Sequence, residues 1–106
     1  LGRGVLTGKY RHGIPADSRA ASRQYTGLDG LNLTEESGQI VDAVTIAARG
    51  MNVSPAEIAL AWVRDRPCVV APIVGARTTA QLRTALASEK LELPVELTNA
   101  LDDVSD

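Results

Sequence analysis

Residues 68–74, with the sequence CVVAPIV, constrain the fold of this chain more than any other segment. The run is short and apolar without alternation, which is typical of a parallel strand covered on both faces. Pro72 cannot donate to a ladder, so we expect the strand to be short or to bend there. The sequence contains no second convincing strand, and one strand cannot make a sheet. It therefore predicts that this strand pairs with strands outside the 106 residues.

Two helices are predicted before the strand. The segment over 34–50 places its apolar residues on one helical stripe, and Gly50 is expected to follow its last turn. The segment over 54–67 begins with a capping box, in which Ser54 is the N-cap and Glu57 the third helical residue. Its apolar residues surround most of the helix, so we expect it to be packed on more than one face.

Two further helices are predicted after the strand. One covers 78–88, where Thr78 and Gln81 repeat the capping-box spacing. The other covers about 94–104 and carries regularly spaced valines and leucines. Four helices and one strand are a lopsided set, which favours part of a larger α/β fold that is mostly helical in isolation. The alternative is an unusual helical fold.

A glycine-rich leader over 1–33 precedes these elements and holds six of the nine glycines. It has no sustained period, so the sequence predicts loop and turn. A loop of this length is usually functional or disordered. Its backbone amides could cradle a pyrophosphate, with Arg3, Lys9 and Arg19 as supporting charges. The alternative is a surface loop with incidental basic residues.

The joint between the strand and the following helix gathers residues that suit a phosphate. A helix N-terminus there presents backbone N–H groups and the positive end of the macrodipole. Gly75 lets a ligand approach the backbone, Arg77 supplies a forked cation, and Thr78 and Thr79 add hydroxyl donors. The alternative is a capped helix with a solvated arginine.

Composition narrows the class of protein. The net charge is −2 and the pI is about 5.3, so the chain lacks the excess of basic residues typical of a nucleic-acid-binding protein. No apolar run approaches the roughly 20 residues that cross a bilayer. Cys68 is the single cysteine and fits a reducing compartment. We therefore expect a cytoplasmic protein with no nucleic-acid and no membrane partner. The start of the chain, without Met or signal peptide, also leads us to expect a fragment.

A helix-turn-helix over 44–63 is a remote alternative. The segment has a helix, a glycine in the turn and a capped second helix at about the right spacing. A recognition helix, however, must present polar and basic side chains to DNA. This one presents Ala, Ile, Leu and Trp, with the acidic Glu57 in its first turn.

Taken together, the segments resemble one family. LGRGVLTGKY followed by IPADSR, then SPAEIALAWVRDRP, VAPIVGARTTAQL and LELPVELTNALDDVS, resembles the C-terminal third of the aldo-keto reductases. The nearest branch includes bacterial oxidoreductases and the voltage-gated potassium channel beta subunits. The resemblance spans nearly all of residues 1–106, with the segments in order.

This resemblance implies an α/β fold, a (β/α)8 TIM barrel that binds NADPH at its C-terminal face. The chain would then be a C-terminal cofactor-binding part over 1–106, with VVAPIV as strand eight and 1–33 as a glycine-rich cofactor loop. The implied pyrophosphate contacts are Leu1, Gly2, Arg3 and Lys9, with Arg19 as a further cofactor contact. The implied contacts to the 2′-phosphate and adenosine end are Gly75, Arg77 and Gln81. The family usually has an asparagine against the adenine where this chain has Ala85.

The resemblance also implies what the chain lacks. The family's catalytic Asp, Tyr, Lys and His lie on earlier strands, so we expect no catalytic residue and no metal site here. His12 is expected to be an exposed loop residue, Trp62 a packing residue and Cys68 a buried one.

The implied function is NADPH-dependent reduction of a small-molecule aldehyde or ketone by the complete protein, with the isolated chain inactive. The alternative is a regulatory, channel-beta-like subunit that binds the redox cofactor. A fragment should expose apolar faces that pack on missing barrel segments or on a second copy.

Overall fold

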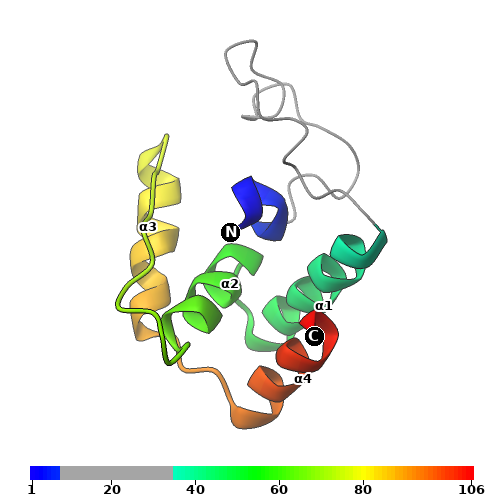
Figure 1. Ribbon diagram of the computed structural model, residues 1–106. Coiled ribbons are helices and arrows are strands. Elements are labelled where there is room, and N and C mark those ends of the chain that lie inside the picture. The colour runs from blue at the N-terminus through cyan, green and yellow to red at the C-terminus, as the bar shows by residue number, and fades with distance from the viewer. Residues whose placement is uncertain (8–34) are drawn as a thin grey trace.

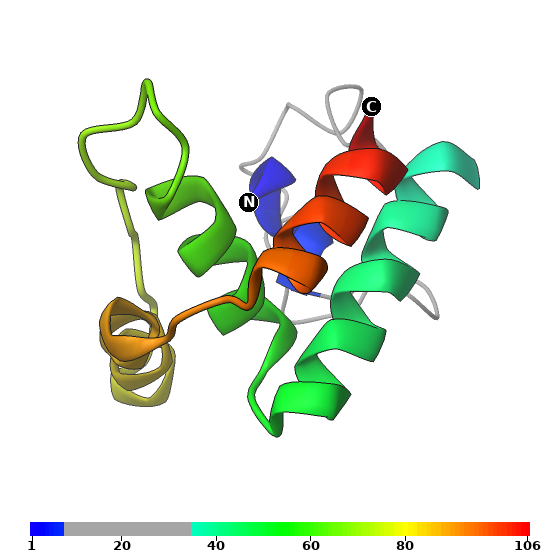
Figure 2. The same ribbon diagram turned by 90° about the horizontal axis from the view of Figure 1, so that it is seen from below.

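The computed structural model describes residues 1–7 and 35–106. The elements are η1 (Gly2–Thr7), α1 (Glu35–Met51), α2 (Pro55–Arg64), α3 (Thr79–Ala87), η4 (Ser88–Lys90) and α4 (Val95–Ser105) (Figure 1). Helix α4 lies along α1, as both views show, and α3 lies beside α2 (Figure 2). Within the described ranges there is no strand, and no helix has the length and apolar character needed to span a bilayer.

The hydrophobic core lies where α1, α2 and α4 meet. Its buried members are the side chains of Val44, Ala47, Ala48, Ile58 and Leu101. Ile58, in α2, has no exposed surface. The two buried alanines of α1 are small, which lets neighbouring helices approach that face closely. A small aliphatic core, expected from a chain with no phenylalanine, is therefore built from three of the four α-helices.

The end of α1 differs from the prediction. Gly50 lies inside the helix, and the residue with the left-handed conformation is Asn52, at φ 57°. Asn52 N donates to Arg49 O at 3.2 Å, and Val53 N donates to Ala48 O at 3.0 Å. This pair of bonds is the Schellman motif, and asparagine is one of the few residues besides glycine that tolerates the required φ.

The start of α2 confirms the predicted capping box. Ser54 Oγ accepts from Glu57 N at 3.2 Å, and Pro55 occupies the first turn. The Ser54 hydroxyl also donates to Glu57 Oε1 at 3.3 Å. Helix α2 contacts η1, α1, α3 and η4 and buries four consecutive residues, Ile58 to Ala61. The other residues of α2 are half-buried and none is exposed, so the helix lacks the exposed polar face of a recognition helix.

Trp62 confirms the expected packing role. Its indole Nε1 donates to Asp102 Oδ1 of α4 at 2.8 Å, and its ring packs against the core. The Arg66 guanidinium carbon lies 4.2 Å from the centre of the Trp62 ring, and Arg66 Nη1 lies 2.9 Å from Asp102 Oδ1. The Trp62 hydrogen bond and the Arg66 ion pair thus join α2 and the residues after it to α4, while the cation–π contact holds Arg66 against Trp62.

The predicted strand over 68–74 is absent from the structure, and that prediction is wrong for the described residues. The segment is irregular, with Val70 103% and Ile73 101% exposed. Cys68 is also exposed, which corrects the expectation that it is buried. The physical reason is shared: no other described residue forms a strand with which this segment could pair, so Cys68, Val70 and Ile73 stay uncovered.

The leader also departs from the prediction at its start. Gly2–Thr7 forms the 3-10 helix η1 in place of irregular loop. Gly4 N and Leu6 N each donate to Leu1 O at 3.2 Å, and Thr7 Oγ1 donates to Gly4 O at 2.6 Å. Gly4 has φ 95°, which L side chains rarely adopt. His12 and the rest of the predicted loop lie outside the described residues.

Candidate cofactor-binding site

The N-terminal end of α3 forms as the sequence predicts, with one difference. Thr78 is the N-cap, and its Oγ1 accepts from Gln81 N at 3.1 Å. In a standard capping box the side chain of Gln81 would return to the N–H of Thr78. Here Gln81 Oε1 accepts from the N–H of Arg77 at 2.8 Å. The return bond therefore fixes the residue before the N-cap, which holds the Arg77 backbone against the helix.

Gly75 lies just before this turn and is exposed. A Cβ built on it would meet no atom within 4 Å, and its φ lies outside the left-handed region. Neither packing nor backbone conformation within the described chain therefore requires glycine here. The open space beside the backbone is where a ligand could approach it closely.

The electrostatics of this helix end favour an anion. The first turn of α3 contains no acidic residue, and Arg77 is exposed beside it. Thr78 Oγ1 accepts from the amide of Gln81. The other first-turn amides, those of Thr79 and Ala80, have no intrahelical acceptor. The helix dipole adds partial positive charge at the same place. A phosphate group matches this combination of donors and charge.

The predicted leader contacts are only partly described. The backbones of Gly2 and Arg3 belong to η1, and Leu1 precedes it with 37% of its surface exposed. Lys9 and Arg19 lie outside the described residues. Helix η1 packs against α1 and α2, while α3 packs against α2. Helix α2 is therefore the element that both candidate segments contact.

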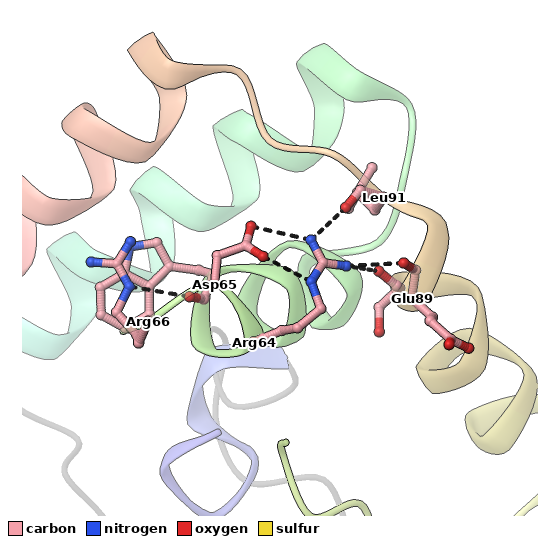
Figure 3. A network of polar contacts seen from close by, with 7 residues as sticks. Arg64, Asp65, Arg66, Glu89 and Leu91 are labelled. Atoms are coloured by element: carbon pink, nitrogen blue, oxygen red, sulfur yellow. Dashed lines mark hydrogen bonds and ion pairs between the residues drawn. The ribbon is translucent and has the colours of Figure 1, made fainter. Parts of the chain in front are cut away.

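The opposite end of α3 is held by Arg64, to which no sequence motif assigns a function (Figure 3). Arg64 Nη1 donates to Ser88 O at 2.7 Å and to Glu89 O at 3.2 Å, and Nη2 donates to Leu91 O at 2.7 Å. A basic residue in the last turn of a helix is ordinary, because it complements the helix dipole. Its acceptors lie 24 to 27 residues further along the chain, and no local pattern indicates them.

Arg64 also forms a two-point ion pair with its neighbour. Arg64 Nε donates to Asp65 Oδ1 at 2.9 Å and Nη2 donates to Oδ2 at 3.1 Å. The hydrogen bond from Arg64 holds the pKa of the Asp65 carboxyl below its usual value, and the same bond raises the pKa of Arg64. Both groups stay charged at neutral pH.

Two remaining positions bear on what the site could hold. Ala85, where the resemblance implies an adenine contact by asparagine, is half-buried, and its carbonyl accepts from Ser88 Oγ. No three His, Cys, Asp or Glu side chains come together as metal ligands within residues 1–7 and 35–106. The described candidate site is therefore built from amides, hydroxyls and a guanidinium.

Known proteins with similar sequences fall in one family. The sequence model described as "Aldo/keto reductase family" matches residues 1–106, the whole of the chain. A probable voltage-gated potassium channel subunit beta from Oryza sativa subsp. japonica is 40% identical over 83 residues, which are 77% of this chain and 25% of that protein. Protein tas from Escherichia coli (strain K12) is 37% identical over 106 residues, which are 98% of this chain and 30% of that protein.

A third relative carries an enzyme name. The L-glyceraldehyde 3-phosphate reductase of Escherichia coli O157:H7 is 36% identical over 84 residues, which are 77% of this chain and 24% of that protein. The chain thus spans between 24% and 30% of the length of these three curated relatives. The family model covers every residue, and the relatives include both kinds that the sequence motifs indicate. The chain belongs to the aldo/keto reductase family.

Proposed function

We propose that the complete protein is an NADPH-dependent oxidoreductase that reduces an aldehyde or ketone to an alcohol, and that this chain binds the phosphates of the cofactor. Membership of the aldo/keto reductase family, which implies a TIM barrel, and the reductase name of one relative support the reaction class. The N-terminal end of α3 carries the binding proposal, because it combines an open glycine, an arginine and first-turn amides.

The 2′-phosphate of NADPH is the group this end of α3 would hold. The Arg77 guanidinium can donate two parallel hydrogen bonds to a phosphate, which makes recognition both strong and oriented. The first-turn amides of Thr79 and Ala80 can donate to the remaining oxygens. NADH lacks this phosphate, so the same residues would discriminate between the two cofactors.

Gln81 and Gly75 have supporting roles in this proposal. The Gln81 side chain binds the Arg77 N–H, so it shapes the turn from which the guanidinium projects. The open side of Gly75 gives the adenosine end of the cofactor room beside the backbone. The adenine contact made by asparagine in the family is not assigned to Ala85.

The pyrophosphate would be held by the leader. The proposed contacts are the backbone at Leu1 and Gly2 and the cations Arg3, Lys9 and Arg19. When bound, NADPH supplies the hydride, while this chain binds and orients the cofactor. The catalytic groups lie elsewhere in the complete protein, so we expect no turnover by residues 1–106 alone. We also expect the complete protein to be cytoplasmic, where an exposed thiol such as Cys68 stays reduced.

Arg77→Ala in the complete protein tests the binding proposal. Loss of a charge-assisted contact, typically about 1.5–3 kcal/mol, should raise the Kd for NADPH by about tenfold or more. The Kd for NADH should change by less than about twofold, since the 2′-phosphate is missing. Both constants are measured by isothermal titration calorimetry.

Arg83→Ala is the matched control, because Arg83 is exposed on α3 and has no polar partner within the described ranges. It removes a charge of the same kind from the helix that follows Arg77 and should leave the preference for NADPH intact. Equal weakening of NADPH and NADH by Arg77→Ala would contradict a 2′-phosphate role.

A regulatory subunit is the second candidate, favoured by the 40% identity to a protein named as a probable potassium channel subunit beta. Such a protein would also bind NADPH, so cofactor affinity does not separate the two functions. Steady-state NADPH oxidation with a panel of aldehydes does. Turnover supports the enzyme, whereas tight NADPH binding without turnover, together with channel association, supports the regulatory subunit.

A further inference from the structure

Helix α3 depends on few contacts for its position. None of its nine residues is buried, and two of its leucines, Leu82 and Leu86, are 46% and 60% exposed. The core formed by α1, α2 and α4 contains no α3 side chain. Hydrophobic burial, which normally fixes a helix on a domain, is therefore weak for α3. Polar contacts at its ends must contribute more than usual to its placement.

Arg64 supplies the strongest of these polar contacts. All five N–H groups of its guanidinium donate, two of them to the Asp65 carboxylate and three to backbone carbonyls. The carbonyls belong to Ser88, Glu89 and Leu91, at the C-terminal end of the α3–η4 unit (Figure 3). Asp65 holds the guanidinium plane, so the group is fixed on both sides.

Two of the acceptors, Ser88 O and Glu89 O, lie at a helix end, and Leu91 O lies in the extended residue that follows. Ser88 O also accepts from Leu91 N at 3.1 Å, so it receives both a backbone and a guanidinium donor. The helix dipole makes this end partly negative, which a fixed guanidinium complements. Ser88 is buried, and its hydroxyl donates to Ala85 O, which joins the bound carbonyls to the last turn of α3. Arg64 therefore ties α2 to α3 at one end only.

The N-terminal end of α3 lies a full helix length from this attachment. Nine residues at about 1.5 Å each give about 13 Å, so a tilt of about 5° at the attached end moves Arg77 by about 1 Å. A functional group must be held within about 0.5 Å of its productive position, so a shift of that size matters. The hydrogen bonds at the C-terminal end of α3 therefore determine the position of its N-terminal end.

We propose that Arg64 is a positioning residue for cofactor recognition: by fixing the C-terminal end of α3–η4 on α2, it sets where Arg77 meets the 2′-phosphate. This inference rests on the proposed function, because it concerns the same site. Arg64 itself touches no cofactor atom in this scheme. Its effect is transmitted through the rigid helix between the two ends.

The test uses Arg64→Met and Arg64→Lys in the complete protein, with Arg83→Met as the matched loss of charge on α3. Arg64→Met keeps an unbranched apolar stem but removes all five donors, and should raise the Kd for NADPH by about fivefold or more. The Kd for NADH should change by less than about twofold, because NADH lacks the group that Arg77 holds. Arg64→Lys, with a single ammonium, should fall between wild type and Arg64→Met.

A second readout separates positioning from general stability. Hydrogen–deuterium exchange over 79–87 should increase in Arg64→Met, while exchange in α1 and α4 stays as in wild type. A residue needed only for stability would lower the melting temperature and leave the ratio of the two cofactor constants unchanged. If Arg64→Met does not fold, the intermediate ratio expected for Arg64→Lys decides the question.

Three outcomes would overturn the inference. They are an unchanged NADPH-to-NADH ratio in both Arg64 variants, an equal change in Arg83→Met, and unaltered exchange over 79–87. Failure of the proposed function has a different signature: wild type would show no preference for NADPH, or Arg77→Ala would leave NADPH binding intact. In that case the positioning role fails with it. When wild type binds NADPH through Arg77 and Arg64→Met matches wild type, only the positioning role fails.

Discussion

Arg64 and Arg66 lie two positions apart at the end of α2, yet their guanidinium groups contact different elements. Arg66 stacks on Trp62 and pairs with Asp102, so it joins α2 to α4 beside the core. Arg64 faces η4 and donates to three carbonyls of that segment. The same residue type at almost the same place thus stabilises the core in one case and orients a peripheral helix in the other.

Asp65→Asn should make stability less dependent on acid pH. The hydrogen bond from Arg64 lowers the pKa of Asp65 in the folded state. The ion pair therefore stabilises the protein at pH values above the pKa of Asp65 in the unfolded chain, about 3.8. This contribution is lost as pH falls through the lower folded pKa. Because the Asp65 side chain is 42% exposed, the loss in Asp65→Asn at pH 7 should be about 0.2–1 kcal/mol.

Urea denaturation at pH 7 and at about pH 2 measures this difference. Asp103→Asn is the control, since Asp103 is exposed on α4 and has no ion pair with any described residue. A loss in Asp65→Asn that persists at the acid pH would show that the carboxylate charge is not responsible.

At the scale of elements, predictions from the sequence succeed where the signal is local. The caps at Ser54 and Thr78 form between residues three apart, and both are found. The end of α1 was missed by two residues because Gly50 and Asn52 both permit a helix to stop. The packing of Val53 on the core favours Asn52, and that contact is not visible in the sequence.

The strand over 68–74 and the role of Arg64 could not be settled from the sequence for a different reason. A strand needs a partner, and the described chain provides none, so apolar composition alone does not fix the conformation. The acceptors of Arg64 are backbone carbonyls, which every residue possesses. Only the folded path of the chain brings those three to one guanidinium.

Asn52→Ala should destabilise the protein by about 1–2 kcal/mol, because alanine pays the steric cost of the left-handed conformation. Asn52→Gly should be neutral or slightly stabilising, since glycine has no Cβ. Asn99→Ala, on the exposed part of α4, is the control and should stay within about 0.5 kcal/mol. Chemical denaturation gives all three values. If Asn52→Ala and Asn52→Gly lost equal free energy of unfolding, the asparagine side chain, and not the left-handed backbone conformation, would be responsible.

At the scale of the whole molecule, the chain combines a small core with a large uncovered apolar surface. Val70, Ile73 and Val95 are each more than 70% exposed, and the first two lie in the segment with the composition of a buried strand. Family membership implies a TIM barrel, in which we propose that other segments of the barrel cover these side chains. Packing on a second copy stays the alternative prediction.

The residues of the candidate site suit cofactor binding rather than the chemical step. The described site offers a guanidinium, amides and hydroxyls, which bind and orient a phosphate. The central claim is accordingly about recognition: the N-terminal end of α3 holds the 2′-phosphate of the cofactor.

Phosphorus NMR of NADP⁺ bound to the complete protein tests that claim most directly. The second pKa of a phosphate monoester is about 6, and contact with the Arg77 guanidinium favours the dianion. We predict that the bound 2′-phosphate resonance titrates below that of free NADP⁺ in wild type and returns toward the free value in Arg77→Ala. A 2′-phosphate that titrates in the wild-type complex as it does free in solution would contradict the account.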